Sequence, residues 1–119
     1  MQLDIVIPCF NEEAVLKEIY LRVNKILEEV KRKKLIDDYK IIFVDDGSND
    51  RTFEIIEKFS QTDQSVKALS LSRNFGHQAA LSAGLKFSKG DAVITLDADL
   101  QDPPELIEKM LQQFYEGFE

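Results

Sequence analysis

Short apolar runs alternate along the chain with longer stretches in which apolar residues recur every three or four positions. The runs are rich in β-branched residues and mostly apolar on both faces, which is typical of parallel strands covered by helices. They span residues 3–7, 41–44, 66–71 and 92–96. Helical spacing follows each run, over about residues 15–30, 51–59, 77–87 and from Pro103 onward. This order predicts an α/β fold with a mostly parallel sheet, alternating helices and right-handed crossovers.

The last predicted helix carries apolar residues almost to the end of the sequence. One stripe continues through Leu106, Ile107, Met110, Leu111 and Phe114. Tyr115 and Phe118 add aromatic side chains after this stripe, and such side chains normally pack against further structure. We therefore expect residues 1–119 to be the truncated N-terminal part of a longer domain.

The composition excludes several classes of protein. Fifteen Lys and Arg against 22 Asp and Glu argue against a nucleic-acid partner, because neutralising phosphates requires basic side chains. The basic run 31–34 ends the first predicted helix, where cations suit the dipole, so we interpret it as a solvated helix end. Cys9, the single cysteine, rules out an intramolecular disulfide and is expected to be a small buried hydrophobe. No apolar run approaches the ~20 residues of a membrane span, so we expect a cytoplasmic chain.

Polar residues follow each predicted strand, at the sheet edge where α/β proteins bind ligands. After the first strand, Asn11 is placed to cap the following helix, with Glu12 and Glu13 in its first turn. Capping leaves Phe10 unexplained, and its ring is suited to stack on a nucleotide base.

The second strand ends in an acidic pair. Gly47 permits a tight turn, and a residue of the segment 48–50 is expected to cap the next helix. This explanation of the turn and the cap does not account for Asp45 and Asp46. A carboxylate there could accept hydrogen bonds from a uracil imide, a guanine edge or ribose hydroxyls.

The third strand is followed by Arg73 and the single histidine, His77. Arg73 could pair with a phosphate, and the N-terminus of the next helix could receive an anion. His77 has no second histidine or a cysteine nearby, so it is a poor metal ligand and more commonly an exposed or capping residue.

The fourth strand delivers two aspartates, Asp97 and Asp99, into a turn. Carboxylates this close repel each other unless a cation lies between them. Asp102 as N-cap, followed by Pro103 at the first helical position, explains the helix start without them. The side chains of Asp97, Asp99 and Gln101 offer the hard oxygen ligands that suit Mg²⁺ or Mn²⁺, and such an ion could carry a substrate phosphate.

Segments 5–13, 44–48 and 97–99, taken in order, resemble the family 2 glycosyltransferases, whose fold is called GT-A. Residues 73–80 and 97–105 are similar to the polyprenyl-phosphate branch of that family. This branch includes dolichol-phosphate mannose synthase and bacterial enzymes that load glucose or modified arabinose onto undecaprenyl phosphate. The resemblance implies the Rossmann-like, nucleotide-binding half of a GT-A domain.

The resemblance also implies roles for the residues at the strand ends. The nucleoside would be bordered by Pro8, Phe10, Glu12, Val44, Asp45 and Asp46. Ala98 and Asp99 would meet the ribose and diphosphate, beside the phosphate-pairing Arg73 suggested above. The catalytic metal, Mg²⁺ or Mn²⁺, would be held by Asp97, Asp99 and Gln101.

The activity implied is an inverting, metal-dependent transfer of a sugar from a UDP- or GDP-linked donor to a polyprenyl phosphate. Relatives carry an acceptor side and often membrane helices further along their chains. We therefore expect a parent protein at the cytoplasmic face of the membrane, while residues 1–119 hold the donor site and have little activity alone. Unpaired sheet edges would favour a homo-oligomer.

Three other functions fit parts of the pattern. A polysaccharide-synthesising member of the same family would use a hydroxyl acceptor and would need a carboxylate base. A phosphoacceptor receiver module also has clustered acids around Mg²⁺, but it places its acid pair after the first strand and a lysine after a fifth. A nucleotide-sensing module without turnover is the third alternative.

Overall fold

The computed structural model describes residues 1–98 and 103–117, and within these ranges strands and helices alternate strictly. The elements are β1 (Gln2–Cys9), α1 (Leu16–Arg32), β2 (Asp38–Asp45), α2 (Thr52–Thr62), β3 (Val66–Ser70), α3 (His77–Phe87), β4 (Ala92–Thr95) and α4 (Leu106–Tyr115). The sheet has the order β3-β2-β1-β4, and every pairing is parallel. The predicted α/β class is confirmed.

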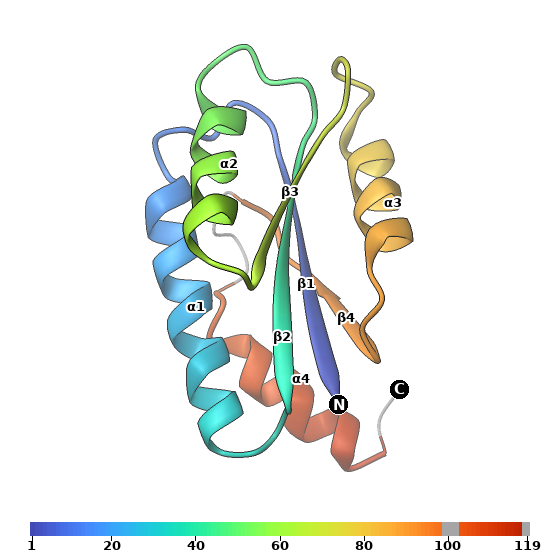
Figure 1. The fold of residues 1–119 in the computed structure, drawn as a ribbon. Helices are drawn as coiled ribbons and strands as arrows, with labels where there is room; N and C mark the ends of the chain where they lie inside the picture. Colours follow the sequence, from blue (N-terminus) through green and yellow to red (C-terminus); the bar gives the residue numbers. More distant parts are fainter. Residues whose placement is uncertain (99–102, 118–119) are drawn as a thin grey trace.

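Helices cover both faces of the sheet, with α1, α2 and α4 on one side and α3 on the other (Figure 1). Period-two alternation in β1 sends Ile5 and Ile7 toward α1 and Val6 toward α3. Both faces of the central strands are therefore buried, which explains why these strands read as continuous apolar runs.

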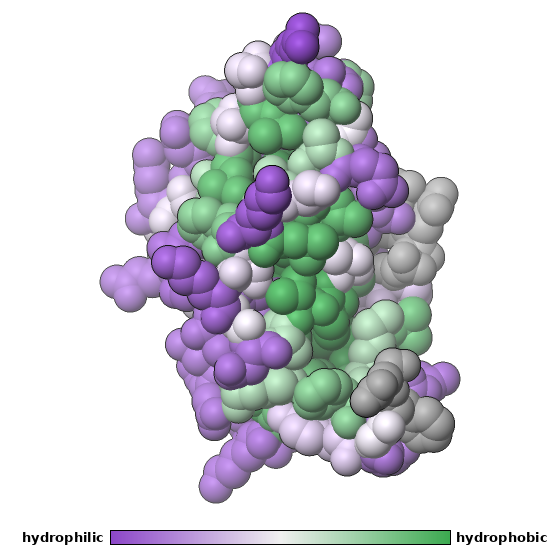
Figure 2. Space-filling view, turned by 90° about the vertical axis from the view of Figure 1, so that its right-hand side faces the viewer, coloured by the Kyte–Doolittle hydropathy of each residue, from purple (hydrophilic) through white to green (hydrophobic). Residues whose placement is uncertain are grey.

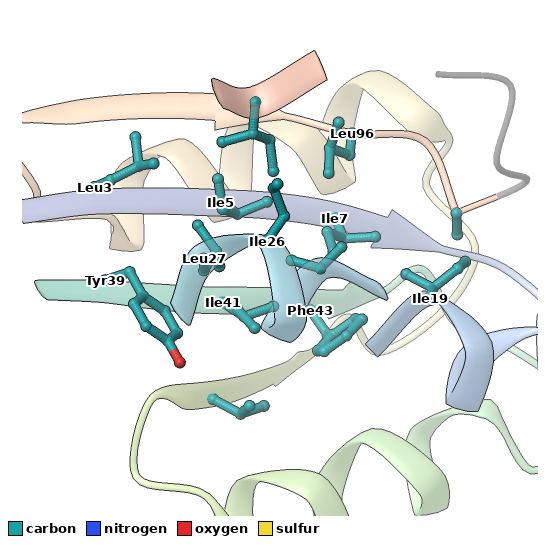
Figure 3. Close-up of a cluster of buried hydrophobic side chains, with 14 of the residues drawn as sticks. Leu3, Ile5, Ile7, Ile19, Ile26, Leu27, Tyr39, Ile41, Phe43 and Leu96 are labelled. Carbon is teal, nitrogen blue, oxygen red and sulfur yellow. The ribbon is translucent and has the colours of Figure 1, made fainter. Parts of the chain in front are cut away.

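The larger core lies between the sheet and α1. Side chains of β1 and β2 meet the helix there, as Figure 3 shows for Leu3, Ile5, Ile41, Phe43 and others. The apolar stripe predicted for the first helix is confirmed. Its buried members are Leu16, Ile19, Val23, Ile26, Leu27 and Val30. The smaller core under α3 contains Val6, Ile42, Val44 and Ala80.

The start of α4 differs from the sequence prediction. The helix begins at Leu106 rather than Pro103, and the residues before it form a turn in which Leu106 N–H bonds the Pro103 carbonyl at 3.0 Å. The reason is that Pro104 disfavours a helical conformation in the residue before it. Glu105, immediately before the helix, accepts a 2.7 Å hydrogen bond from Arg22 of α1.

The basic end of α1 agrees with the prediction of a solvated helix terminus. Lys31 lies 3.5 Å from the Asp38 carboxylate, and Lys33 forms a 2.7 Å ion pair with Glu108 of α4. These cations therefore link the helix end to its neighbours.

A buried carboxylate fixes the amino edge of the sheet. Asp4 in β1 is 1% exposed and accepts hydrogen bonds from the N–H groups of Lys89 and Gly90, at 3.1 and 2.8 Å. The Ser88 hydroxyl donates to the same carboxylate at 2.6 Å. Burial opposes its ionisation, but these bonds and one from Gln2 outweigh it and lower the pKa of Asp4. Asp4 thus clamps the turn that leads from α3 into β4.

A band of hydrophobic surface runs down the face that carries α3 (Figure 2). Beside β4, an apolar groove of about 430 Å³ is lined by Val93, Met110 and Phe114, among others. Within the described ranges β4 pairs only with β1, so its other edge is unpaired, and self-association through it stays a prediction. In the same ranges, no helix is both long and apolar enough to cross a bilayer.

Candidate functional site

A cavity of about 370 Å³ opens at the carboxyl edge of the sheet. It lies where β1 and β2 end, where the chain leaves β4, and where α3 begins. Its lining consists of Pro8, Cys9, Phe10, Glu12, Asp46, Asn74, Gly76, His77, Ala80, Asp97 and Ala98. Residues that the sequence assigned to a donor or metal site, from Pro8 near one end of the chain to Ala98 near the other, therefore share one cavity.

The loop that carries Phe10 is fastened to the loop after β2. Asn11 N–H donates to the Ser48 hydroxyl, and Asn49 N–H donates to the Asn11 side-chain oxygen, both at 2.9 Å. Glu12 N–H bonds the Thr52 hydroxyl at 2.8 Å. The prediction that Asn11 caps α1 is wrong, because the helix begins at Leu16 and the Asn11 amide is used between the loops instead.

The second loop is shaped by its own acidic residues. Asp45 is 3% exposed and accepts the Ser48 N–H at 3.2 Å. Asp50 accepts the Thr52 N–H at 2.9 Å, so it is the member of segment 48–50 that bonds the start of α2. Asp46 is 4% exposed, and its two oxygens accept N–H groups from the loop between β3 and α3.

Three predicted donor-binding residues lie outside the cavity. Val44 is fully buried under α3, in the smaller core. Asp45 and Arg73 line a neighbouring hollow of about 520 Å³, which shares the Phe10 ring with the first cavity. The Arg73 guanidinium lies over the Phe75 ring, 4.7 Å from its centroid. Phe10, 39% exposed, and Asn74 belong to the lining of both hollows, which therefore adjoin.

Residues 4–119 match the family described as "Glycosyl transferase family 2". The chain belongs to this family. The match covers all four strand ends that form the site.

Several curated relatives align with this family 2 domain over nearly its whole length. An uncharacterized glycosyltransferase, YkcC of Bacillus subtilis, is 44% identical over 100% of the chain and 35% of its own length. The undecaprenyl-phosphate 4-deoxy-4-formamido-L-arabinose transferase of Pseudomonas aeruginosa is 43% identical over 97% of the chain and 33% of its own length. The family 2 domain thus spans about a third of the length of the curated relatives it matches.

Solved structures of the same fold accompany these relatives. TarS residues 1–349 from S. aureus superimpose with a TM-score of 0.72 at 24% identity, over 98% of this chain and 33% of theirs. The mannosyltransferase PcManGT of Pyrobaculum calidifontis, in complex with GDP-Man and Mn²⁺, gives a TM-score of 0.66 at 22% identity. That alignment covers 85% of this chain and 32% of the mannosyltransferase chain. The sheet and helices of the family 2 domain therefore have the predicted GT-A arrangement.

The predicted metal ligands lie only partly within the described ranges. Asp97 lines the cavity, and its carboxylate lies 3.7 Å from His77 Nε2. Asp99 and Gln101 fall outside the described residues. Within residues 1–98 and 103–117, no group of three potential metal ligands comes together. The Asp97 side chain is nevertheless 43% exposed, and its carboxylate is the kind of ligand that Mg²⁺ and Mn²⁺ accept.

The cavity also contains residues whose place the sequence did not indicate. Asn74 and Gly76 line it from the loop before α3, beside His77, for which the sequence favoured an exposed or capping role. Asn74 and Gly76 follow the third strand, at the sheet edge where ligands bind, and this position could have indicated that they belong to the site. Cys9 is 2% exposed, as predicted, and its thiol donates to the Ile7 carbonyl at 3.4 Å. Burial and the nearby carboxylates of Glu12 and Asp45 raise the pKa of Cys9, which favours the neutral thiol over the thiolate.

Proposed function

We propose that this domain binds the nucleotide-sugar donor of an inverting, metal-dependent glycosyltransferase with a polyprenyl phosphate acceptor. The observation that carries the proposal is the cavity in which Phe10, Glu12, Asp46 and Asp97 meet from three strand ends. The Pseudomonas relative, named as an undecaprenyl-phosphate transferase, supports the acceptor class. TarS, whose structures include complexes with UDP and UDP-GlcNAc, supports a nucleotide-sugar donor.

The donor nucleoside is proposed to lie between Pro8, Phe10 and Glu12. The Phe10 ring is exposed enough to stack on a base, and its loop is fixed by the bonds through Asn11. Ala98, which is 4% exposed, would flank the ribose and diphosphate. Arg73 lines the second hollow and not the first cavity, so a phosphate contact from it would require the donor to reach into that hollow.

Asp97, Asp99 and Gln101 are the proposed ligands of Mg²⁺ or Mn²⁺. The Asp97 carboxylate faces the cavity and has the oxygen chemistry that such ions prefer, so the described part of the ligand set fits. When bound, the ion would supply positive charge against the departing nucleoside diphosphate. The mannosyltransferase of the same fold, which contains GDP-Man and Mn²⁺, supports this choice of ion.

The remaining chemistry depends on the acceptor. A polyprenyl phosphate oxygen is already ionised at neutral pH, so it can attack the anomeric carbon without a general base. Attack on the face opposite the leaving diphosphate inverts the configuration of that carbon. The domain spans about a third of these relatives. The acceptor side is proposed to lie in the rest of the whole protein, which is proposed to act at the cytoplasmic face of the membrane.

Calorimetry with UDP and with GDP, each with and without Mn²⁺, tests this proposal. One nucleotide should bind, and binding should weaken at least about tenfold without metal, as expected for a charge-assisted contact. Asp97→Asn should remove most of the metal dependence, while Glu57→Gln, which removes one exposed charge from α2, should change nothing. Equal affinity with and without Mn²⁺ would refute the metal assignment, and no binding of either nucleotide would refute the donor site.

A further inference from the structure

Residues 64–90 differ in charge from the rest of the chain. They contain no Asp or Glu, although the whole sequence has 22 of these residues among its 119. The same segment carries Lys67, Arg73, Lys86 and Lys89. It forms β3, α3 and the loops that flank them, so the charge difference belongs to one continuous part of the structure. A protein with a net charge of −7 thus contains a basic segment within its fold.

The lysines of this segment are open to an anionic partner. Lys67, Lys86 and Lys89 are exposed, and within the described ranges none of the three forms an ion pair with a carboxylate. On the opposite face, Lys31 and Lys33 at the end of α1 are each paired with a carboxylate. The positive charge beside α3 is therefore not neutralised in the way that the basic end of α1 is.

Three lysines surround a small hollow at the amino edge of the sheet. The hollow, of about 200 Å³, is lined by Gln2, Asp4, Lys40, Ile42, Lys67, Phe87 and Lys89. The lysines come from β2, from β3 and from the turn after α3, and among the described residues of the lining they outnumber the single carboxylate. Phe87, the last residue of α3, is 43% exposed. An aromatic ring and three ammonium groups therefore gather in one place.

The outward side of α3 extends this surface toward the candidate cavity. Gln78, Ser82 and Leu85 are exposed, and their spacing places them on one side of the helix. The helix begins at His77, which lines the cavity, and ends at Phe87, which lines the basic hollow. The hydrophobic band of Figure 2 runs down the same face. One face of the molecule thus connects the cavity to the basic hollow.

We infer that this face is the surface through which the domain contacts a membrane rich in anionic lipid. We call it the basic face and define it by Lys40, Lys67, Leu85, Lys86, Phe87 and Lys89. Lysines are attracted to anionic headgroups, while exposed leucine and phenylalanine side chains can enter the boundary between headgroups and acyl chains. The combination of both kinds of side chain favours a lipid surface over a soluble anion.

The inference rests on the proposed polyprenyl phosphate acceptor, whose apolar tail holds it in a bilayer. With α3 lying along the lipid surface, the start of this helix would bring the cavity mouth at His77 toward the level of the headgroups. The phosphate of the acceptor lies at that same level. Contact through the basic face would therefore present the cavity to the acceptor from the side of α3.

A single introduced tryptophan tests the contact directly, because the sequence contains none. Phe87→Trp places the indole on the basic face, and Leu21→Trp places one on α1, where the native side chain is 53% exposed. Vesicles of phosphatidylcholine with about one third phosphatidylglycerol provide the anionic surface. They should shift the emission of Phe87→Trp to shorter wavelength and leave that of Leu21→Trp unchanged. No shift in Phe87→Trp, or equal shifts in both variants, would overturn the inference.

Lysine substitutions separate the basic face from net charge. Lys86→Gln with Lys89→Gln should weaken binding to the same vesicles by about tenfold or more, since each lysine near an anionic surface contributes roughly fivefold. Lys31→Gln with Lys33→Gln removes the same charge from the opposite face and should change binding by less than about twofold. Sedimentation of the chain with vesicles measures both. Equal weakening by the two pairs would show that only net charge matters, and the inference would fail.

Two further conditions exclude other occupants of this face. Equal binding to pure phosphatidylcholine vesicles would show that the lysines do not contribute. A shift in Phe87→Trp emission on raising the chain concentration without lipid would show that a second copy covers the face. Either result would overturn the inference. All these measurements omit nucleotide, so a chain that binds nucleotide but no vesicles refutes the membrane contact alone. A chain that binds vesicles but no nucleotide counts against the donor site alone.

Discussion

His77 Nε2 lies 3.7 Å from Asp97 Oδ1, across the mouth of the cavity between α3 and the end of β4. Both side chains are about half exposed, at 56% and 43%, so each is open to a ligand. The distance is too long for a hydrogen bond but lies within ion-pair range, so the two groups attract each other whenever the imidazole is protonated.

Replacing His77 by alanine should weaken nucleotide binding several-fold but leave its dependence on Mn²⁺ intact. The imidazole supplies a polar group to the cavity wall, whereas the ion is assigned to Asp97 and its neighbours. Titration calorimetry at several Mn²⁺ concentrations measures both quantities. Loss of the metal dependence in His77→Ala would mean that the imidazole itself holds the ion.

Gly47→Ala should lower the free energy of unfolding by about 3 kcal/mol, because it combines an unfavourable backbone angle with a main-chain clash. The clash is with the Arg73 carbonyl carbon, 2.2 Å from the added Cβ. Gly117→Ala is the control, since Gly117 also has a positive φ of +91°, and among the described residues no atom lies within 4 Å of an added Cβ. Only the strain of about 1 kcal/mol is expected there. Urea denaturation compares the two, and equal losses would contradict the close contact of the loops.

The Asp4 clamp should make stability fall in acid. Its pKa is lower in the folded chain than the usual 3.8, so its contribution is complete above that value. The contribution is lost as the pH falls from the usual value through the lowered pKa, because the unfolded chain takes up a proton on Asp4 before the folded chain does. Denaturation between about pH 5 and pH 2 should show a shallower acid decline in Asp4→Asn than in the unmodified chain. Parallel curves would show that Asp4 does not carry this dependence.

Two leucines of α1 should differ sharply when replaced by alanine. Leu27 is fully buried in the larger core, and Leu27→Ala should cost about 2–5 kcal/mol through lost burial and a residual cavity. Leu21 lies on the same helix but is 53% exposed, and Leu21→Ala should stay within about 0.5 kcal/mol. Thermal or urea unfolding provides both values. Similar costs for the two would contradict the assigned face of α1.

The fold could be predicted because the residues that are buried in it are the ones whose apolar side chains recur with helical or strand spacing in the sequence. The stripe of α1 and the range His77–Phe87 of α3 follow directly from the spacing of apolar residues. Local chemistry at helix starts was less predictable. Asn11 is a residue type that commonly caps helices, but in this structure it bonds Ser48 and Asn49 of the next strand-end loop. These partners are 37 and 38 residues away, so a local sequence pattern does not reveal them.

The candidate site was predictable at the level of the sheet edge and not at the level of individual contacts. Strand ends placed Phe10, Asp46 and Asp97 in one cavity, as a parallel sheet requires. Whether a carboxylate faces a ligand or a neighbouring amide depends on loop packing, which is why Asp46 is bound to Phe75 and Gly76. The bonds between Asp46 and the segment after β3 join residues about 30 positions apart, so they could be identified only from the tertiary structure.

The bonds that join Asn11 to Ser48 and Asn49 make the first two strand-end loops a single mechanical unit. The backbone that carries Phe10 cannot shift toward an arriving ligand unless the turn containing Ser48 moves with it or those bonds break. Because Phe10 belongs to the lining of both hollows, such a shift would reshape the two together.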